Sequence, residues 1–99
     1  MKTTNSCNNI VSYSLVSISS NYTVDVLDYF ILCTANSFEV TLPTAVGNQN
    51  RTYQIKNSGD GTITLLPHGA ETIDGEDSQV IYPAECLTVI SNNSNWYVI

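Results

Sequence analysis

The sequence holds few side chains that could carry out acid–base chemistry. His68 is the only histidine among the 99 residues, and it lies between Pro67 and Gly69, two residue types that favour turns. A solvent-exposed turn residue is the simplest interpretation. The alternative is a metal site in a threefold assembly, where three copies of one histidine could meet on the axis. A general-base role would need a paired nucleophile, and the sequence indicates none.

The densest group of carboxylates is Asp74, Glu76 and Asp77, in the order D-G-E-D. This order differs from the D-x-D-x-D-G pattern of a calcium-binding loop. A solvated turn is therefore the expected role, with a weak calcium site as the alternative. As a glycosidase pair, the carboxylates would need a cleft and a defined separation, which the sequence does not indicate. We expect no enzymatic activity, no cofactor and no dedicated metal site.

The three cysteines, Cys7, Cys33 and Cys86, form no C-x-x-C or Cys/His pattern typical of zinc sites. Cys33 ends an apolar run and Cys86 precedes Leu87, so free, buried thiols acting as small apolar side chains are expected. A disulfide between Cys33 and Cys86 is the alternative.

Binding is a better fit to the composition than catalysis. Nine acidic against three basic residues give a net charge of −6, which argues against nucleic-acid and anionic-membrane partners. No stretch approaches the ~20 apolar residues of a membrane helix, and no apolar segment of a signal peptide follows Met1–Ser6. Loop amides, hydroxyls and a free tyrosine can hydrogen-bond to and stack on glycans. The residues expected to contact a glycan or receptor are Asn57, Ser58, Asp60, Tyr82, Asn92 and Asn93.

The elements that would position these residues are strands. Asn, Ser and Thr occur eleven times each, a composition that disfavours helices and suits strands and turns. Tyr53 and Ile55 alternate with polar residues, and after the turn formers of 57–61 the alternation resumes at Ile63 and Leu65. This pattern predicts a β-hairpin with a long loop. Eight to ten such short strands predict a small antiparallel β-sandwich or barrel-like domain over residues 10–99, preceded by a flexible or docked arm over residues 1–9.

Two segments carry apolar residues on both faces of the expected strand. They are Tyr29–Cys33 and the closing Trp96–Ile99. A domain of this size has difficulty covering both faces of a strand within one chain. We therefore expect a neighbouring chain to cover the second face. Trp96, in phase with Val98, is expected to be buried.

Several ordered pieces of the sequence resemble one protein family. The pieces are Asp28–Ile31, Val40–Pro43, Tyr53–Asn57, Thr62–Leu65, Glu71–Gly75, Leu87–Ile90 and Asn95–Ile99. Over Ser20–Ile99 their order resembles small β-rich domains found near the C-terminal ends of bacteriophage tail fibres and tail spikes. The resemblance implies a homotrimeric virion protein that contacts other virion proteins and that binds the host surface or supports the domain that does. The polar loop composition makes a host surface glycan the expected ligand. The resemblance carries over no binding residues.

Such domains usually end a long fibrous chain, whereas this sequence has 99 residues and begins with Met1. The sequence is therefore expected to be either the excised tip of such a chain or a whole small virion protein. The second case makes a small capsid decoration or head-fibre protein an alternative function. A lectin-like carbohydrate-binding module is a further alternative. As a tail-fibre domain or as a capsid protein, it is expected in the virion, after assembly in the host cytoplasm.

Overall fold

The computed structural model describes residues 14–99 and contains only strands, turns and loops. The all-β prediction is therefore confirmed over this range, and no helix there could cross a membrane. Residues 1–13 lie outside the described residues. They include the expected arm over residues 1–9, with Cys7, and the first four residues of the predicted domain. The strands are β2 (Leu15–Ile18), β3 (Tyr22–Thr23), β4 (Phe30–Cys33), β5 (Glu39–Thr41), β6 (Thr52–Asn57), β7 (Ile63–Leu66), β8 (Gln79–Ile81), β9 (Cys86–Ser91) and β10 (Trp96–Val98).

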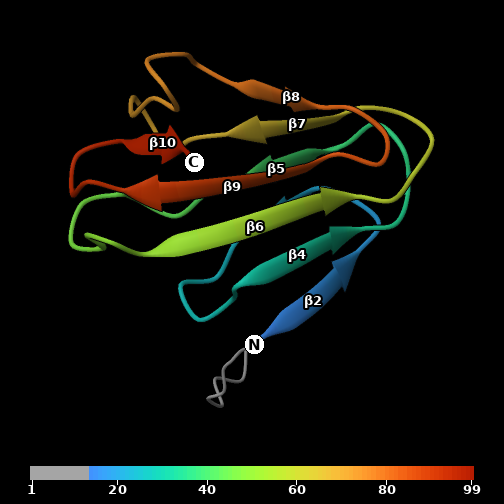
Figure 1. Ribbon diagram of the computed structural model, residues 1–99, viewed down its shortest axis with the longest axis horizontal. Helices are drawn as coiled ribbons and strands as arrows, with labels where there is room; N and C mark the ends of the chain where they lie inside the picture. The colour runs from blue at the N-terminus through green and yellow to red at the C-terminus, as the bar shows by residue number, and fades with distance from the viewer. Residues whose placement is uncertain (1–13) are drawn as a thin grey trace, which may run out of the picture.

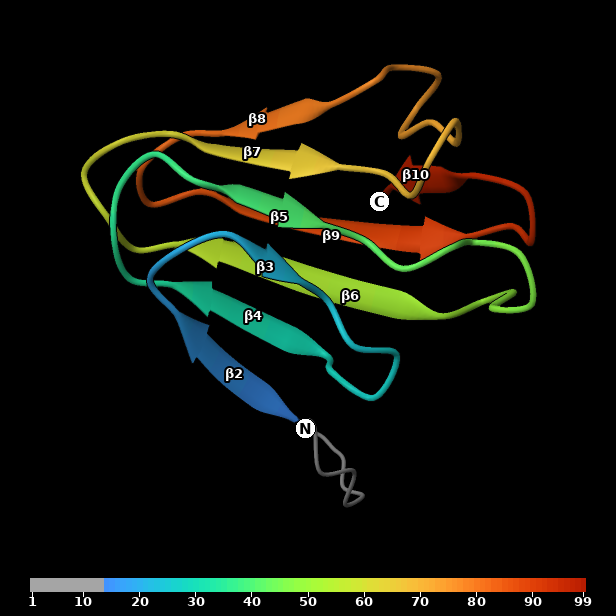
Figure 2. The ribbon, with the colours of Figure 1, turned by 180° about the vertical axis from the view of Figure 1, so that it is seen from behind.

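The strands form two sheets that face each other across the core (Figure 1). One sheet has the strand order β10-β9-β6-β4-β2, and the other has the order β3-β5-β7-β8. Up to β7 the chain alternates between the sheets, so β2–β3, β4–β5 and β6–β7 each make one coil, and successive coils stack on one another (Figure 2). The stacked strands are parallel, while β8, β9 and β10 add antiparallel pairs after the last coil.

This topology corrects two predictions. The sheets are mixed rather than antiparallel, because the coils pair strands that run in the same direction. The predicted hairpin is also wrong, since β6 and β7 lie in different sheets. The alternation itself is correct: Tyr53, Ile55, Ile63 and Leu65 are all completely buried. Alternation indicates which side chains point inward, but two strands that face each other across a core give the same pattern as two paired strands.

The corners of successive coils, where the chain passes from one sheet to the other, are joined by side-chain hydrogen bonds. The Asn21 side chain accepts a hydrogen bond from the backbone N–H of Glu39 in the next coil, at 2.9 Å. One coil further, Asn36 Oδ1 accepts from the backbone N–H groups of Asp60 and Gly61. A Cβ atom at Gly59 would lie 2.4 Å from the carbonyl oxygen of Ala35, so glycine is required for this approach. These asparagines satisfy backbone donors that the strand ladders leave unpaired.

The core between the sheets is apolar and centres on two aromatic rings. Trp96 and Tyr53 are completely buried, and their ring centroids lie 5.6 Å apart. The Trp96 indole N–H donates to the Pro43 carbonyl oxygen at 3.1 Å, and the Tyr53 hydroxyl donates to the Val26 carbonyl oxygen at 3.1 Å. Both rings thus bury apolar area while their polar atoms are paired. The predicted burial of Trp96 is confirmed.

Candidate functional site

The residues predicted to contact a receptor do not form one surface. Since β6 and β9 are antiparallel, the end of β6 lies beside the start of β9, and the loop after β9 lies at the opposite end of the sheet (Figure 1). Ser58, Asp60 and Tyr82 therefore lie at one end of the molecule, and Asn92 and Asn93 lie at the other. A single ligand of ordinary size cannot contact both groups.

Several of these side chains are already used within the fold. Asn57 is completely buried, its amide N–H donates to the carbonyl oxygens of Gly61 and Ile81, and its Oδ1 accepts from the backbone N–H of Gly59. It cannot contact a receptor in this fold. Asn92 Oδ1 accepts from two backbone N–H groups of its own loop, and Asn93 Oδ1 accepts from Gly47 N at 2.7 Å. Ser58 donates to the Cys33 carbonyl oxygen. Asp60 and Tyr82 are exposed, and within residues 14–99 neither side chain makes a hydrogen bond, so these two are the freest of the set.

The histidine and the carboxylates that suggested acid–base or metal chemistry lie on the surface. His68, Asp74, Glu76 and Asp77 are all exposed, and Asp74 Oδ1 accepts from the backbone N–H of Val98. Among residues 14–99, no three His, Cys, Asp or Glu side chains lie close enough to hold a metal ion.

The two described cysteines are both free. Cys33 is completely buried, as expected, and burial raises the pKa of its thiol to about 11. Cys86 is exposed, contrary to the prediction, because it faces outward from β9 opposite Lys56.

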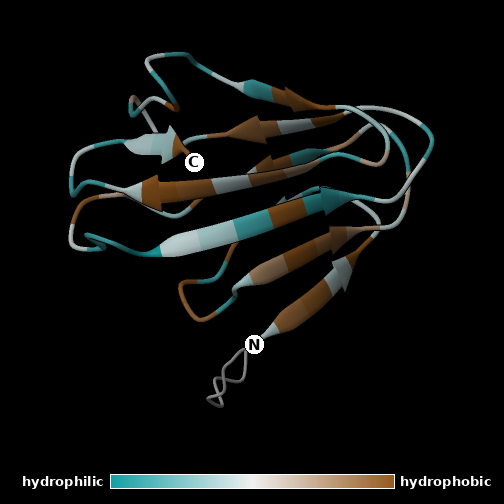
Figure 3. Ribbon diagram, in the orientation of Figure 1, coloured by the Kyte–Doolittle hydropathy of each residue, from teal (hydrophilic) through white to brown (hydrophobic). Residues whose placement is uncertain are grey.

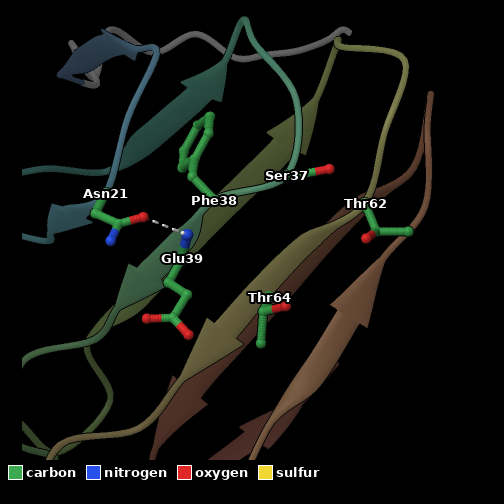
Figure 4. A pocket seen from close by; sticks show the side chains of 6 residues that line it. All are labelled: Asn21, Ser37, Phe38, Glu39, Thr62 and Thr64. Carbon is green, nitrogen blue, oxygen red and sulfur yellow. Dashed lines mark hydrogen bonds between the residues drawn. The ribbon is translucent and has the colours of Figure 1, made fainter.

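A groove on the outer face of the four-stranded sheet gathers polar side chains instead. It has a volume of about 410 Å³, and Figure 4 shows the lining side chains, which come from the corner before β3, from β5 and the residues before it, and from β7 with the residue before it. The lining residues are Asn21, Ser37, Phe38, Glu39, Thr62 and Thr64. None of them was among the contact residues predicted from the sequence. The only signal available was the Asn, Ser and Thr content of the coil corners, and that content is high throughout the chain.

The residues that line the groove offer hydrogen-bonding groups, but they include no set of metal ligands and no nucleophile–base pair. Within residues 14–99, the Glu39 carboxylate and the hydroxyls of Ser37, Thr62 and Thr64 make no hydrogen bond, and Glu39 makes no ion pair. The Phe38 ring turns away from the Glu39 and Thr64 side chains (Figure 4) and is only 8% exposed. The site can therefore hydrogen-bond to a polar ligand, but it provides no aromatic ring for stacking.

The outer face of the five-stranded sheet is different in character. On β2 and β4, Leu15 and Phe30 are register partners, and Leu32 lies two residues further along β4 on the same face. Leu15 is 57% exposed, while Phe30 and Leu32 are partly exposed. The apolar colouring of these strands is evident in Figure 3. The second face of the Tyr29–Cys33 segment is thus only partly covered by the described part of the chain.

Comparison of the chain with protein-family models, curated proteins and solved structures gave no match.

Proposed function

We propose that this protein is a non-enzymatic, homotrimeric virion module of a bacteriophage, placed at the tip or outer part of a tail fibre or spike and involved in host attachment. The observation that carries the proposal is the contrast between the two outer faces. One face presents Leu15, Phe30 and Leu32, and the other presents the hydroxyl-rich groove. The resemblance of Ser20–Ile99 to tail-fibre and tail-spike domains supplies the biological setting.

The apolar face supports self-association. Large apolar side chains gathered on the solvent-facing side of a sheet, here exposed Leu15 beside partly exposed Phe30 and Leu32, are typical of an interface. Because each copy carries the same row, closed symmetry would bury all copies of it at once. With the five-stranded sheets turned toward a threefold axis, the four-stranded sheets and their grooves would point away from the axis.

The polar face supports attachment. Hydroxyl, amide and carboxylate groups bind glycans with modest affinity at each site. Three linked copies raise the effective concentration of the second and third binding events, so weak single sites can give firm attachment. This property suits a fibre tip and is unnecessary for a protein that only decorates a capsid.

The experiment measures adsorption of the purified protein to host cells and its competition with phage particles. We expect saturable binding that reduces phage adsorption, and a monomeric variant such as Leu32→Glu should bind far more weakly because it loses avidity. Electron microscopy of virions labelled with an antibody to the protein gives the location. Absence of cell binding together with symmetric label on the capsid shell would overturn the attachment role in favour of capsid decoration.

A further inference from the structure

We propose that the groove on the four-stranded sheet binds a neutral glycan, with Glu39 and Thr64 contacting its hydroxyl groups. The proposal deepens the attachment role and depends on it only for the source of the glycan, the host surface. It relocates the binding site from the loops selected in the sequence to the outer face of β5 and β7.

The groups that line the groove match the hydrogen-bonding needs of sugar hydroxyls. A sugar hydroxyl both donates and accepts, so it requires acceptors, donors and groups that can do either. The Glu39 carboxylate is a pure acceptor, and three hydroxyls from Ser37, Thr62 and Thr64 can do either. The Asn21 amide is held in place because its Oδ1 accepts from Glu39 N at 2.9 Å, and this bond leaves the amide N–H₂ as the donor.

The two principal groups are positioned by strands rather than by mobile loops. Glu39 and Thr64 are direct register partners in the parallel pair β5–β7, so their side chains leave the same face of the sheet. Neighbouring strands lie about 4.8 Å apart, a separation that adjacent hydroxyls of one sugar ring can bridge. Figure 4 shows both side chains on the open side of the sheet. Groups fixed by a sheet lose little conformational freedom when a ligand binds.

The charge of the groove and the kinds of side chain in it restrict the class of ligand. Glu39 is the only charged residue that lines the groove within the described part of the chain, and the whole chain has a net charge of −6. A phosphate or a sialylated glycan would be repelled by both. A metal ion would need further ligands, and among residues 14–99 no three acidic, histidine or cysteine side chains lie close enough together to hold one. A neutral ligand rich in hydroxyl groups is not repelled by Glu39 and can use every polar group that lines the groove.

The test is a titration of the isotope-labelled protein with methyl glycosides of glucose, galactose and N-acetylglucosamine, followed by two-dimensional NMR. We expect at least one of these sugars to shift the backbone amide signals of residues 37–39 and 62–64, at concentrations up to tens of millimolar. Glu39→Gln and Thr64→Val should each weaken this binding about tenfold, because the first replaces a charged acceptor by a weaker neutral one and the second removes the hydroxyl that bonds to the sugar. The matched controls, Glu76→Gln and Thr41→Val, make the same chemical changes outside the groove and should leave the affinity unchanged.

Three outcomes would overturn the proposal: no shifts with any of the sugars, shifts located away from the groove, or equal affinity in the groove variants and the controls. The first two outcomes are read from the wild-type titration alone, so they can be observed even if a variant fails to fold. Cell adsorption separates this proposal from the attachment role. If adsorption survives Glu39→Gln and Thr64→Val, glycan binding in the groove is refuted but the attachment role is not. If the sugar binds in the groove and the protein does not adsorb to cells, the attachment role is refuted but glycan binding in the groove is not.

Discussion

Trp96 connects the last strand to the middle of the chain through one side chain. Its ring packs against Tyr53, its indole N–H donates to the Pro43 carbonyl oxygen, and its backbone bridges to Ile73. The indole is completely buried although β10 has only three residues. Such a short strand has few ladder hydrogen bonds, so the buried ring must supply most of what holds it in place.

Trp96→Ala is therefore expected to lower the free energy of unfolding by about 3–5 kcal/mol, through lost burial and the cavity that remains. Chemical denaturation followed by circular dichroism measures this change. Tyr82→Ala is the control, because Tyr82 is 56% exposed and its truncation should cost less than about 0.5 kcal/mol. An unchanged unfolding midpoint in Trp96→Ala would contradict the anchoring role.

Tyr22 provides a prediction about alkaline pH. Its hydroxyl donates to the Asp28 carboxylate, and this hydrogen bond, followed by burial and the negative charge of Asp28, raises the pKa of Tyr22 from 10.0 to about 12. In the folded state the proton is held more tightly than in the unfolded chain. The stabilisation is fully present below pH 10 and is lost as the pH rises from about 10 to about 12.

Tyr22→Phe should lower stability at neutral pH by about 1 kcal/mol, because the hydrogen bond to Asp28 is lost. It should also weaken the dependence of stability on pH between about 10 and 12. Some dependence should remain, because burial also raises the pKa of Tyr53. Urea unfolding midpoints measured across this range for wild type, Tyr22→Phe and the exposed control Tyr82→Phe test it. The same alkaline slope in wild type and Tyr22→Phe would refute the role assigned to the Asp28 contact.

At the scale of elements, the sequence predicted strands and inward faces but not their partners. The residues in register, Ile18, Cys33 and Asn57, are each followed three positions later by a polar corner residue, Asn21, Asn36 and Asp60. This is a weak internal repeat of the coil. It was hidden because register partners Leu15 and Phe30 are 15 residues apart, whereas Phe30 and Gln54 are 24 apart. The longer second coil destroys the fixed period by which repeats are recognised.

The candidate site was missed for a related reason. The position of Asn57 in a polar loop predicts a contact residue, yet Asn57 lies in register with buried Cys33 and satisfies the backbone of the corner that follows. Glu39 and Thr64 are 25 residues apart and come together only through parallel stacking of coils. No local pattern in the sequence encodes that pairing, because hairpin and coil give the same alternation.

Asn36 tests the stacking of the corners. Asn36→Ala removes an acceptor used by two backbone N–H groups of the next coil and should cost about 1–2 kcal/mol of stability. Asn36→Asp keeps an oxygen at the same position, so it should retain most of the stability and serves as the control. Thermal or urea unfolding measures both. If the two variants were equally destabilised, the side-chain oxygen would not be the stabilising group.

At the scale of the whole molecule, the parallel coils determine which residues reach each outer face. Every outward position on β2 and β4 meets the equivalent position of the next coil, so apolar residues in neighbouring coils merge into one surface, as Leu15 and Phe30 do. The same stacking brings Glu39 beside Thr64 on the opposite side of the molecule. An assembly that buries the first surface therefore leaves the second accessible, so the proposed trimer and the proposed glycan site are compatible.

The trimer is tested by placing a charge in the middle of the apolar face. Leu32 lies between Ser17 and Lys56 in the register of the five-stranded sheet, so the nearby ammonium group can partly neutralise an introduced carboxylate in a monomer. Buried in an interface between copies, the same carboxylate would be repelled by the equivalent carboxylates of the other copies and would lose its hydration.

Light scattering should give wild type three times the 10.8 kDa chain mass, and Leu32→Glu should give the single-chain mass with an unchanged circular dichroism spectrum. Thr23→Glu, on the outer face of the other sheet, should remain trimeric. A monomeric wild type, or a trimeric Leu32→Glu beside a monomeric Thr23→Glu, would show that the five-stranded sheet is not the interface.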